Sequence, residues 1–118
     1  MSTPLAEHLG APDPATLDRV LAPDVRFHSP VADYAGDEQV RRLLTLVPGA
    51  LDEVRIGRTL RGDDEAVTFL AGRVGDHAID GVLDERYDAD GRVAEITLMI
   101  RPLAGLREAV ERMAAALR

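Results

Sequence analysis

Three side chains in this sequence have the chemistry needed to move protons: two neighbouring carboxylates, Asp84 and Glu85, and the imidazole of His28. The carboxylates fall in a strand predicted over residues 79–87, where successive side chains point to opposite faces. Glu85 shares the more apolar face with Leu83, so we expect it to face the interior of the protein. A carboxylate among aliphatic groups loses hydration, which raises its pKa and suits it to act as a general acid or base.

Two alternatives stay open for this pair. Glu85 falls near the end of its strand, so it can instead reach water or pair with Arg73. A bulge in the hairpin would bring Asp84 to the inner face in place of Glu85.

His28 is the histidine that falls inside a predicted strand, residues 25–29, and its partly neutral imidazole can shuttle protons near neutral pH. The alternative is a structural histidine whose ring is hydrogen-bonded away from the cavity. His8 and His77 fall in a fraying terminus and a turn, so we expect both in solvent. Because no histidine of a predicted helix has an acidic residue at helical spacing, and no His-x-His pair occurs, we predict no metal site and no cofactor.

The cavity is expected to have mainly aliphatic walls, because the chain has only two Phe and two Tyr residues. The Tyr34 hydroxyl can bind a carbonyl group, or Tyr34 can serve packing alone. Ser29 is most simply a cap or a hydrogen-bonding group at a strand end. These walls favour an apolar ligand, terpenoid- or polyketide-like, over a nucleotide. The residues expected to contact it are Ser29, Tyr34, Phe69, Leu83, Ile96 and Leu98.

The first half of the chain is predicted to be mainly helical. Residues 3–9 suit a short helical turn, and Asp13-Pro14 provides the N-cap and first position of a helix that stops before Pro23. Apolar residues spaced i, i+3, i+4 and i+7 predict a further helix that begins near Asp37 and ends at Pro48-Gly49.

From Glu53 the pattern alternates, which predicts four strands joined by short turns. The longest hairpin spans residues 78–101, and Asp90-Gly91 supplies the positive φ that its turn needs. A closing amphipathic helix starts at Pro102. This order predicts an α+β fold, a cone-shaped, curved antiparallel sheet with helices packed on its concave face, in one domain of residues 1–118.

The composition excludes several classes of function. The chain has a formal charge of -7 and no cysteine, which rules out disulfides and thiolate zinc sites. Its acidic residues are spread along the sequence without a basic stripe, which argues against nucleic acid and against anionic membranes as partners. The amino terminus lacks a basic, apolar leader, so we expect a cytoplasmic protein.

Several segments together resemble a known family: APDVRFHSPV at residues 22–31, Tyr34-x-Gly36, DADGRVAEIT at residues 88–97, and IRPL at residues 100–103. They resemble the SnoaL-like branch of the nuclear transport factor 2-like superfamily, and the likeness covers about residues 14–118. The resemblance implies the ketosteroid isomerase and polyketide cyclase-like fold. The resemblance does not indicate one particular function, because isomerases, cyclases, epoxide hydrolases, dehydratases and binding domains share this scaffold.

The active sites of three enzyme groups in this superfamily are incomplete here. Ketosteroid isomerases have an Asp that acts as the catalytic base where this chain has Ser29, although Asp84 can match their second Asp. Polyketide cyclases have an acid/base Asp where this chain has Leu98. Limonene epoxide hydrolases use an Arg-x-Asp pair, and the nearest string here, Ala78-Ile79-Asp80, lacks the Arg.

Two functions therefore stay open. The first is a cofactor-independent isomerase, cyclase or hydrolase in which Glu85 or Asp84 acts with His28 or Ser29. The second is a non-catalytic ligand-binding or accessory domain. In both cases we expect a homodimer through the convex face of the sheet, although that face can instead bind another protein. On the last strand this face carries Val93, Glu95, Thr97, Met99 and Arg101.

Overall fold

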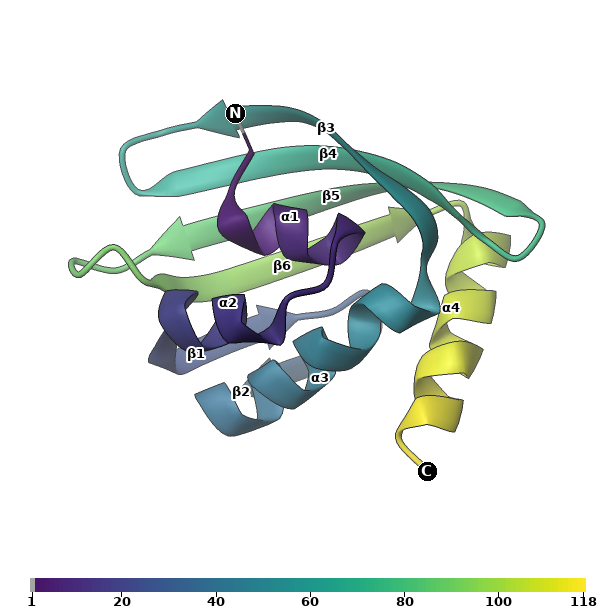
Figure 1. Ribbon diagram of the computed structural model, residues 1–118, viewed down its shortest axis with the longest axis horizontal. Helices are drawn as coiled ribbons and strands as arrows, with labels where there is room; N and C mark the ends of the chain where they lie inside the picture. The colour runs from purple at the N-terminus through teal and green to yellow at the C-terminus, as the bar shows by residue number, and fades with distance from the viewer. Residues whose placement is uncertain (1) are drawn as a thin grey trace.

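A curved, six-stranded sheet forms one layer of the molecule in the computed structural model, which describes residues 2–118 (Figure 1). In space the strands follow the order β2-β1-β6-β5-β4-β3. Their bounds are β1 Leu21–His28, β2 Asp33–Ala35, β3 Asp52–Arg61, β4 Glu65–Val74, β5 His77–Tyr87 and β6 Val93–Arg101.

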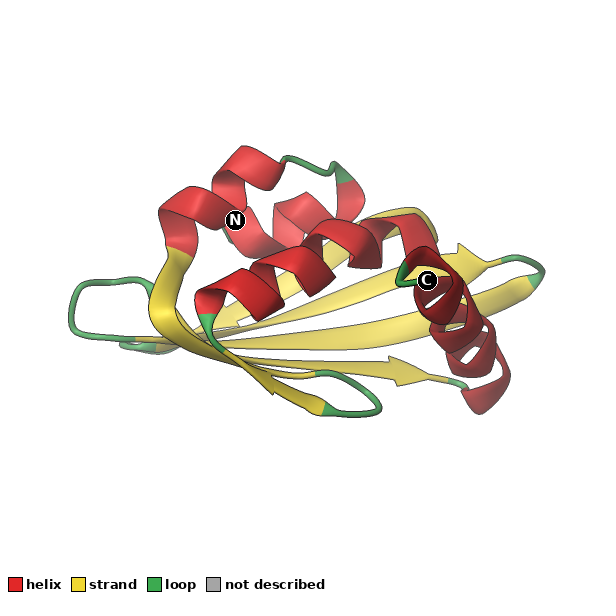
Figure 2. Ribbon diagram, turned by 90° about the horizontal axis from the view of Figure 1, so that it is seen from below, coloured by secondary structure: helices red, strands yellow, loops and turns green. Residues whose placement is uncertain are grey.

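The helices form the second layer, on one side of the sheet (Figure 2). Three of them, α1, α2 and α3, lie across its concave face, and α4 packs at the end of the sheet where β6 finishes (Figure 1). This arrangement confirms the predicted α+β class. The helix bounds are α1 Pro4–Gly10, α2 Pro14–Val20, α3 Asp37–Ala50 and α4 Leu103–Ala116.

The predicted meander is present, because β3, β4, β5 and β6 pair in sequence order and antiparallel. Its last turn has the predicted chemistry. The Asp88 carboxylate accepts hydrogen bonds from the backbone N–H groups of Asp90 and Arg92, at 2.9 and 3.0 Å. Gly91 has a φ of 79°, a conformation that glycine adopts without strain.

The sheet differs from the prediction in one pair: β1 runs parallel to β6, which makes the sheet mixed. Phe27 lies opposite Ile96, and His28 lies opposite Thr97. Parallel neighbours need a long crossover connection. Helix α3 and the first three strands of the meander provide one, and nothing in the alternation within residues 25–29 indicates the direction of the partner strand.

Helix α3 runs through Pro48 to Ala50, although the sequence predicts that Pro48-Gly49 ends it. Pro48 has no N–H to donate to the carbonyl of Leu44, four residues earlier. His8 replaces that donor, because its Nε2 lies 2.9 Å from the Leu44 oxygen while its Nδ1 accepts the backbone N–H of Asp13. His8 is therefore buried between α1 and α3, and the expectation that it lies in solvent is wrong.

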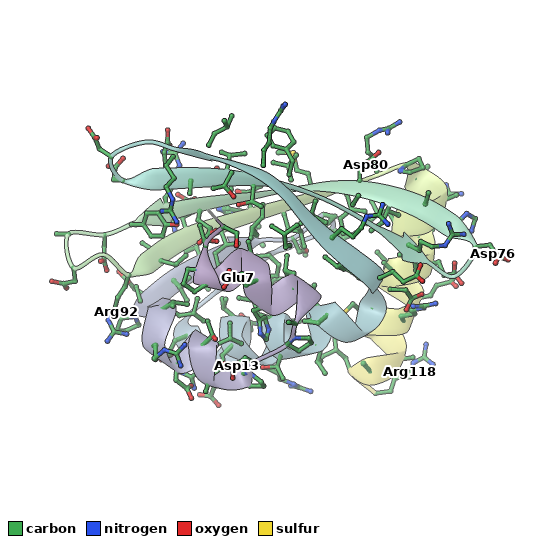
Figure 3. All side chains as sticks on the ribbon, turned by 45° about the horizontal axis from the view of Figure 1, so that its top comes forward. Glu7, Asp13, Asp76, Asp80, Arg92 and Arg118 are labelled. Carbon is green, nitrogen blue, oxygen red and sulfur yellow. The ribbon has the colours of Figure 1, made fainter. Side chains whose placement is uncertain are left out.

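The two faces of the sheet differ in burial. Alternate residues of β5, among them Ile79, Leu83 and Glu85, are buried on the concave face beneath the helices. The charged residues labelled in Figure 3 lie at the outside of the molecule. Within residues 2–118, none of the helices has the length and apolar character needed to cross a membrane.

Candidate functional site

An apolar pocket of about 90 Å³ lies between α3, α4 and the β1–β6 part of the sheet. Strand β1 contributes Phe27 and strand β6 contributes Leu98, both from inward-facing positions. The remaining lining residues come from β6 (Ile100), from the loop after β1, from β2, from the two helices and from their ends. They are Ser29, Pro30, Val31, Tyr34, Leu43, Val47, Ala50, Leu51, Ile100, Leu106, Ala109, Val110, Met113 and Leu117.

Helix α4 forms one whole wall of the pocket. The apolar face of this helix has to be covered by another element, but the sequence could not show that the face lines a pocket. Two contacts fix the helix in place. Gly105 lets it approach Ile79 closely, because a Cβ at Gly105 would lie 2.4 Å from a methyl carbon of Ile79. The Arg112 guanidinium donates to both oxygens of the Asp52 carboxylate, at 3.1 and 3.0 Å.

The polar groups at the pocket are few. Among the lining residues, Tyr34 is the only one with an ionisable side chain. The Ser29 hydroxyl donates to the Ala32 carbonyl at 2.9 Å and accepts from two backbone N–H groups of its own loop. This hydroxyl is therefore a turn-forming group, which matches the simpler of the two roles open to Ser29.

Glu85 faces inward but lies beneath α1, away from the lining of the apolar pocket. Its side chain is 1% exposed. The Thr3 hydroxyl donates to Oε2, and the Tyr87 hydroxyl donates to Oε1 at 3.1 Å. Burial raises the pKa of Glu85, against the opposing effect of these two hydrogen bonds. The sequence reasoning anticipated the buried carboxylate but not its contact with Thr3, which is 82 residues away in the chain.

His28 points to the convex face of the sheet, where its ring lies between two carboxylates. Its Nδ1 is 2.7 Å from the Asp33 carboxylate and its Nε2 is 2.7 Å from the Glu95 carboxylate. Hydrogen bonds with Asp33 and then with Glu95 raise the pKa of His28. The two ring nitrogens face apart, so the carboxylates do not converge on one point. Within residues 2–118, no three His, Cys, Asp or Glu side chains are grouped as metal ligands.

The other predicted site residues are divided between the two faces. Leu83 and Ile96 are core residues on the concave face, beside the pocket but not among its lining. Phe69 lies half-buried on the convex face, where the Arg58 guanidinium carbon is 4.3 Å from its ring centroid. Asp84 is also half-buried and faces the convex side, opposite Thr97 of β6. The structure thus brings Ser29, Tyr34 and Leu98 together at the pocket and leaves Glu85, Asp84 and His28 outside it.

Comparison with solved structures supports the fold. The chain is similar to a structure named steroid delta-isomerase from Pseudomonas aeruginosa, with 29% identity and a TM-score of 0.88 over 99% of this chain and 93% of that one. A bacterial protein with a cystatin-like fold from Silicibacter pomeroyi DSS-3 has 22% identity and a TM-score of 0.89, covering 95% of this chain and 81% of that one. A protein from Jannaschia sp. CCS1, described as a SnoaL-like polyketide cyclase, has 18% identity and a TM-score of 0.70, covering 89% and 85%.

The sequence matches no curated protein. It does match the family model described as SnoaL-like domain, over residues 5–100. That match takes in α1 except its first residue, the whole sheet except its final residue, and the residues that line the pocket from β1, α3 and β6. The chain therefore belongs to the SnoaL-like domain family.

Proposed function

We propose that the protein binds a small, uncharged, apolar molecule in the pocket between α3, α4 and the sheet. The observation that carries this proposal is the composition of the pocket wall, which has no carboxylate, imidazole, ammonium or guanidinium group among its lining residues. A charged ligand would lose its hydration there without gaining a partner. Tyr34, which lines the pocket from β2, is the side chain best suited to bind a carbonyl or hydroxyl group of the ligand.

The volume of the pocket limits the size of the ligand. Pockets for drug-sized molecules measure roughly 300–1,000 Å³, whereas this one measures about 90 Å³. Buried apolar cavities of about 150 Å³ take up benzene or xenon. We therefore expect a single ring, a short branched chain, or one end of a longer terpenoid- or polyketide-like molecule whose remainder lies outside.

Binding can be tested with benzene as the probe and a matched pair of variants on α4. Ala109 is buried and lines the pocket, whereas Ala114 is exposed on the same helix and does not. We expect benzene to cause saturable NMR shifts in the wild type and in Ala114→Leu, and none in Ala109→Leu, because leucine adds three carbon atoms inside the cavity. Equal binding by both variants would place the benzene site elsewhere.

A second candidate function is acid–base catalysis by Glu85. It is favoured by the buried carboxylate, whose pKa is raised, and by a groove beside α1 that Glu85 lines together with Leu5, Arg61 and Tyr87. The similar structure named steroid delta-isomerase suggests the reaction to try, isomerisation of a double bond in a steroid. We expect Glu85→Gln to abolish any turnover that the wild type shows. Unchanged turnover in that variant would remove Glu85 from the mechanism.

We also propose that two copies pair through the convex face of the sheet. Two large apolar side chains are exposed there, Met99 at 62% and Leu60 at 56%, and burying such groups favours association. Replacing Thr97 with Arg together with Met99 with Glu should yield monomers by light scattering. A dimer of unchanged mass would mean that the interface lies elsewhere.

A further inference from the structure

One side of the pocket mouth is a four-residue loop, residues 29–32, which we call the lip. Three of its residues, Ser29, Pro30 and Val31, line the pocket. The lip joins β1 to β2, and the last residue pair before it is His28 opposite Asp33. The side chains of that pair lie on the convex face, so their contact is separate from the groups that face a ligand.

The geometry of His28 requires a protonated ring. An ionised carboxylate has no proton to donate, so each of the two contacts at 2.7 Å needs an N–H from the imidazole. Only the imidazolium carries a proton on both nitrogens. A neutral ring must give up its hydrogen bond with either Asp33 or Glu95.

The charged groups around the ring indicate which contact is lost. Glu95, on β6, also lies 3.5 Å from the Arg26 guanidinium on β1 and is acted on by the charge of Arg86 on β5. Asp33, on the three-residue strand β2, is 79% exposed and has His28 as its salt-bridge partner within residues 2–118. Deprotonation of His28 therefore weakens the tie to β2 more than the tie to β6.

We propose that protonated His28 is a positioning residue for the pocket: by bridging β2 and β6 it holds the lip in place and slows the exchange of ligand. Loss of the proton loosens β2, which stays paired with β1 through its backbone, and speeds this exchange. The effect on ligand exchange rests on the proposed binding function, whereas the effect on the lip rests on the contacts described above. The upward shift in the pKa of His28 keeps the bridge intact over a wider range of pH.

The test measures the dissociation rate of benzene by NMR line-shape analysis on the full chain, from about pH 6 to about pH 9, a range around the ordinary histidine pKa of about 6.5. Ring signals of His28 report its protonation in the same samples. We expect the rate to rise about two- to fivefold as His28 deprotonates, the effect of losing a partly exposed charged pair. His28→Gln should show the faster rate throughout. His77→Gln, a control at an exposed histidine beside Glu108 on α4, should keep the pH step.

A dissociation rate that stays constant while the His28 ring titrates would overturn the inference. If benzene fails to bind at any pH, the proposed function fails instead, and the lip is then tested in the free protein. There, 15N order parameters of the lip amides should fall as His28 deprotonates in the wild type, and should be low at every pH in His28→Gln. Order parameters that do not change with pH in the wild type would refute the role of His28.

Discussion

Replacing Thr3 with Val should destabilise the protein by about 2–4 kcal/mol. Thr3 is fully buried and makes two contacts through one hydroxyl, which accepts the N–H of Ala6 at 3.1 Å as the N-cap of α1 and donates to Glu85. Loss of an N-cap costs about 1 kcal/mol. Removal of one partner of a buried carboxylate costs about 1–3 kcal/mol. Valine keeps the shape of threonine, so the loss reports the hydroxyl and not a cavity.

The assay is urea unfolding followed by far-ultraviolet circular dichroism, with Thr3→Ser as the control. Serine retains the hydroxyl and removes one methyl group, a change of about 1 kcal/mol. In the Glu85→Gln background, Thr3→Val should cost less, because the pair is coupled. If Thr3→Val is as stable as Thr3→Ser, then the Thr3 to Glu85 contact does not hold α1 on the sheet, and our account of the buried carboxylate is refuted.

Two further predictions concern packing and pH. Gly105→Ala should destabilise the fold in urea unfolding. Overpacking against buried Ile79 costs about 1–3 kcal/mol, which exceeds the roughly 1 kcal/mol that alanine gains over glycine in a helix. In the control Gly49→Ala the new Cβ meets no atom within 4 Å, so this variant should be as stable as the wild type or more stable. Since burial raises the folded-state pKa of Glu85, its protonated form favours folding at low pH, and that contribution is lost as pH rises from the unfolded-state value through the folded one. As pH rises from about 4.5, the free energy of unfolding of Glu85→Gln should therefore fall less than that of the wild type. If the free energy of unfolding falls equally with pH in both proteins, Glu85 does not change its pKa on folding.

Patterns among neighbouring residues were sufficient to predict much of the fold. The alternation after Glu53 and the turn at Gly91 depend on neighbouring residues, so the meander and the inward direction of Glu85 followed from the sequence. The N-cap and proline pair that correctly started α2 at Asp13 is repeated at Thr3, and the same signal would have strengthened the prediction of α1.

What the sequence could not provide are contacts between distant segments. Pro48 implies that the Leu44 carbonyl lacks its helical donor, but only the packing of α1 on α3 identifies His8 as the replacement. In the same way, β1 had no indicated partner, so the parallel pairing that places His28 beside Glu95 was not foreseen. Glu85 lies outside the pocket because α1 covers its part of the sheet, whereas Asp84 and His28 lie outside it because they face the convex side.

The measurement that tests the central claim most directly is the detection of intermolecular NOEs between benzene and methyl groups of the protein. If the pocket between α3, α4 and the sheet is the binding site, benzene should show NOEs to Leu43, Leu98 and Met113, which line it from three different elements. NOEs to Leu5 of α1, or none to the three pocket residues, would contradict the account and direct attention to the groove beside Glu85.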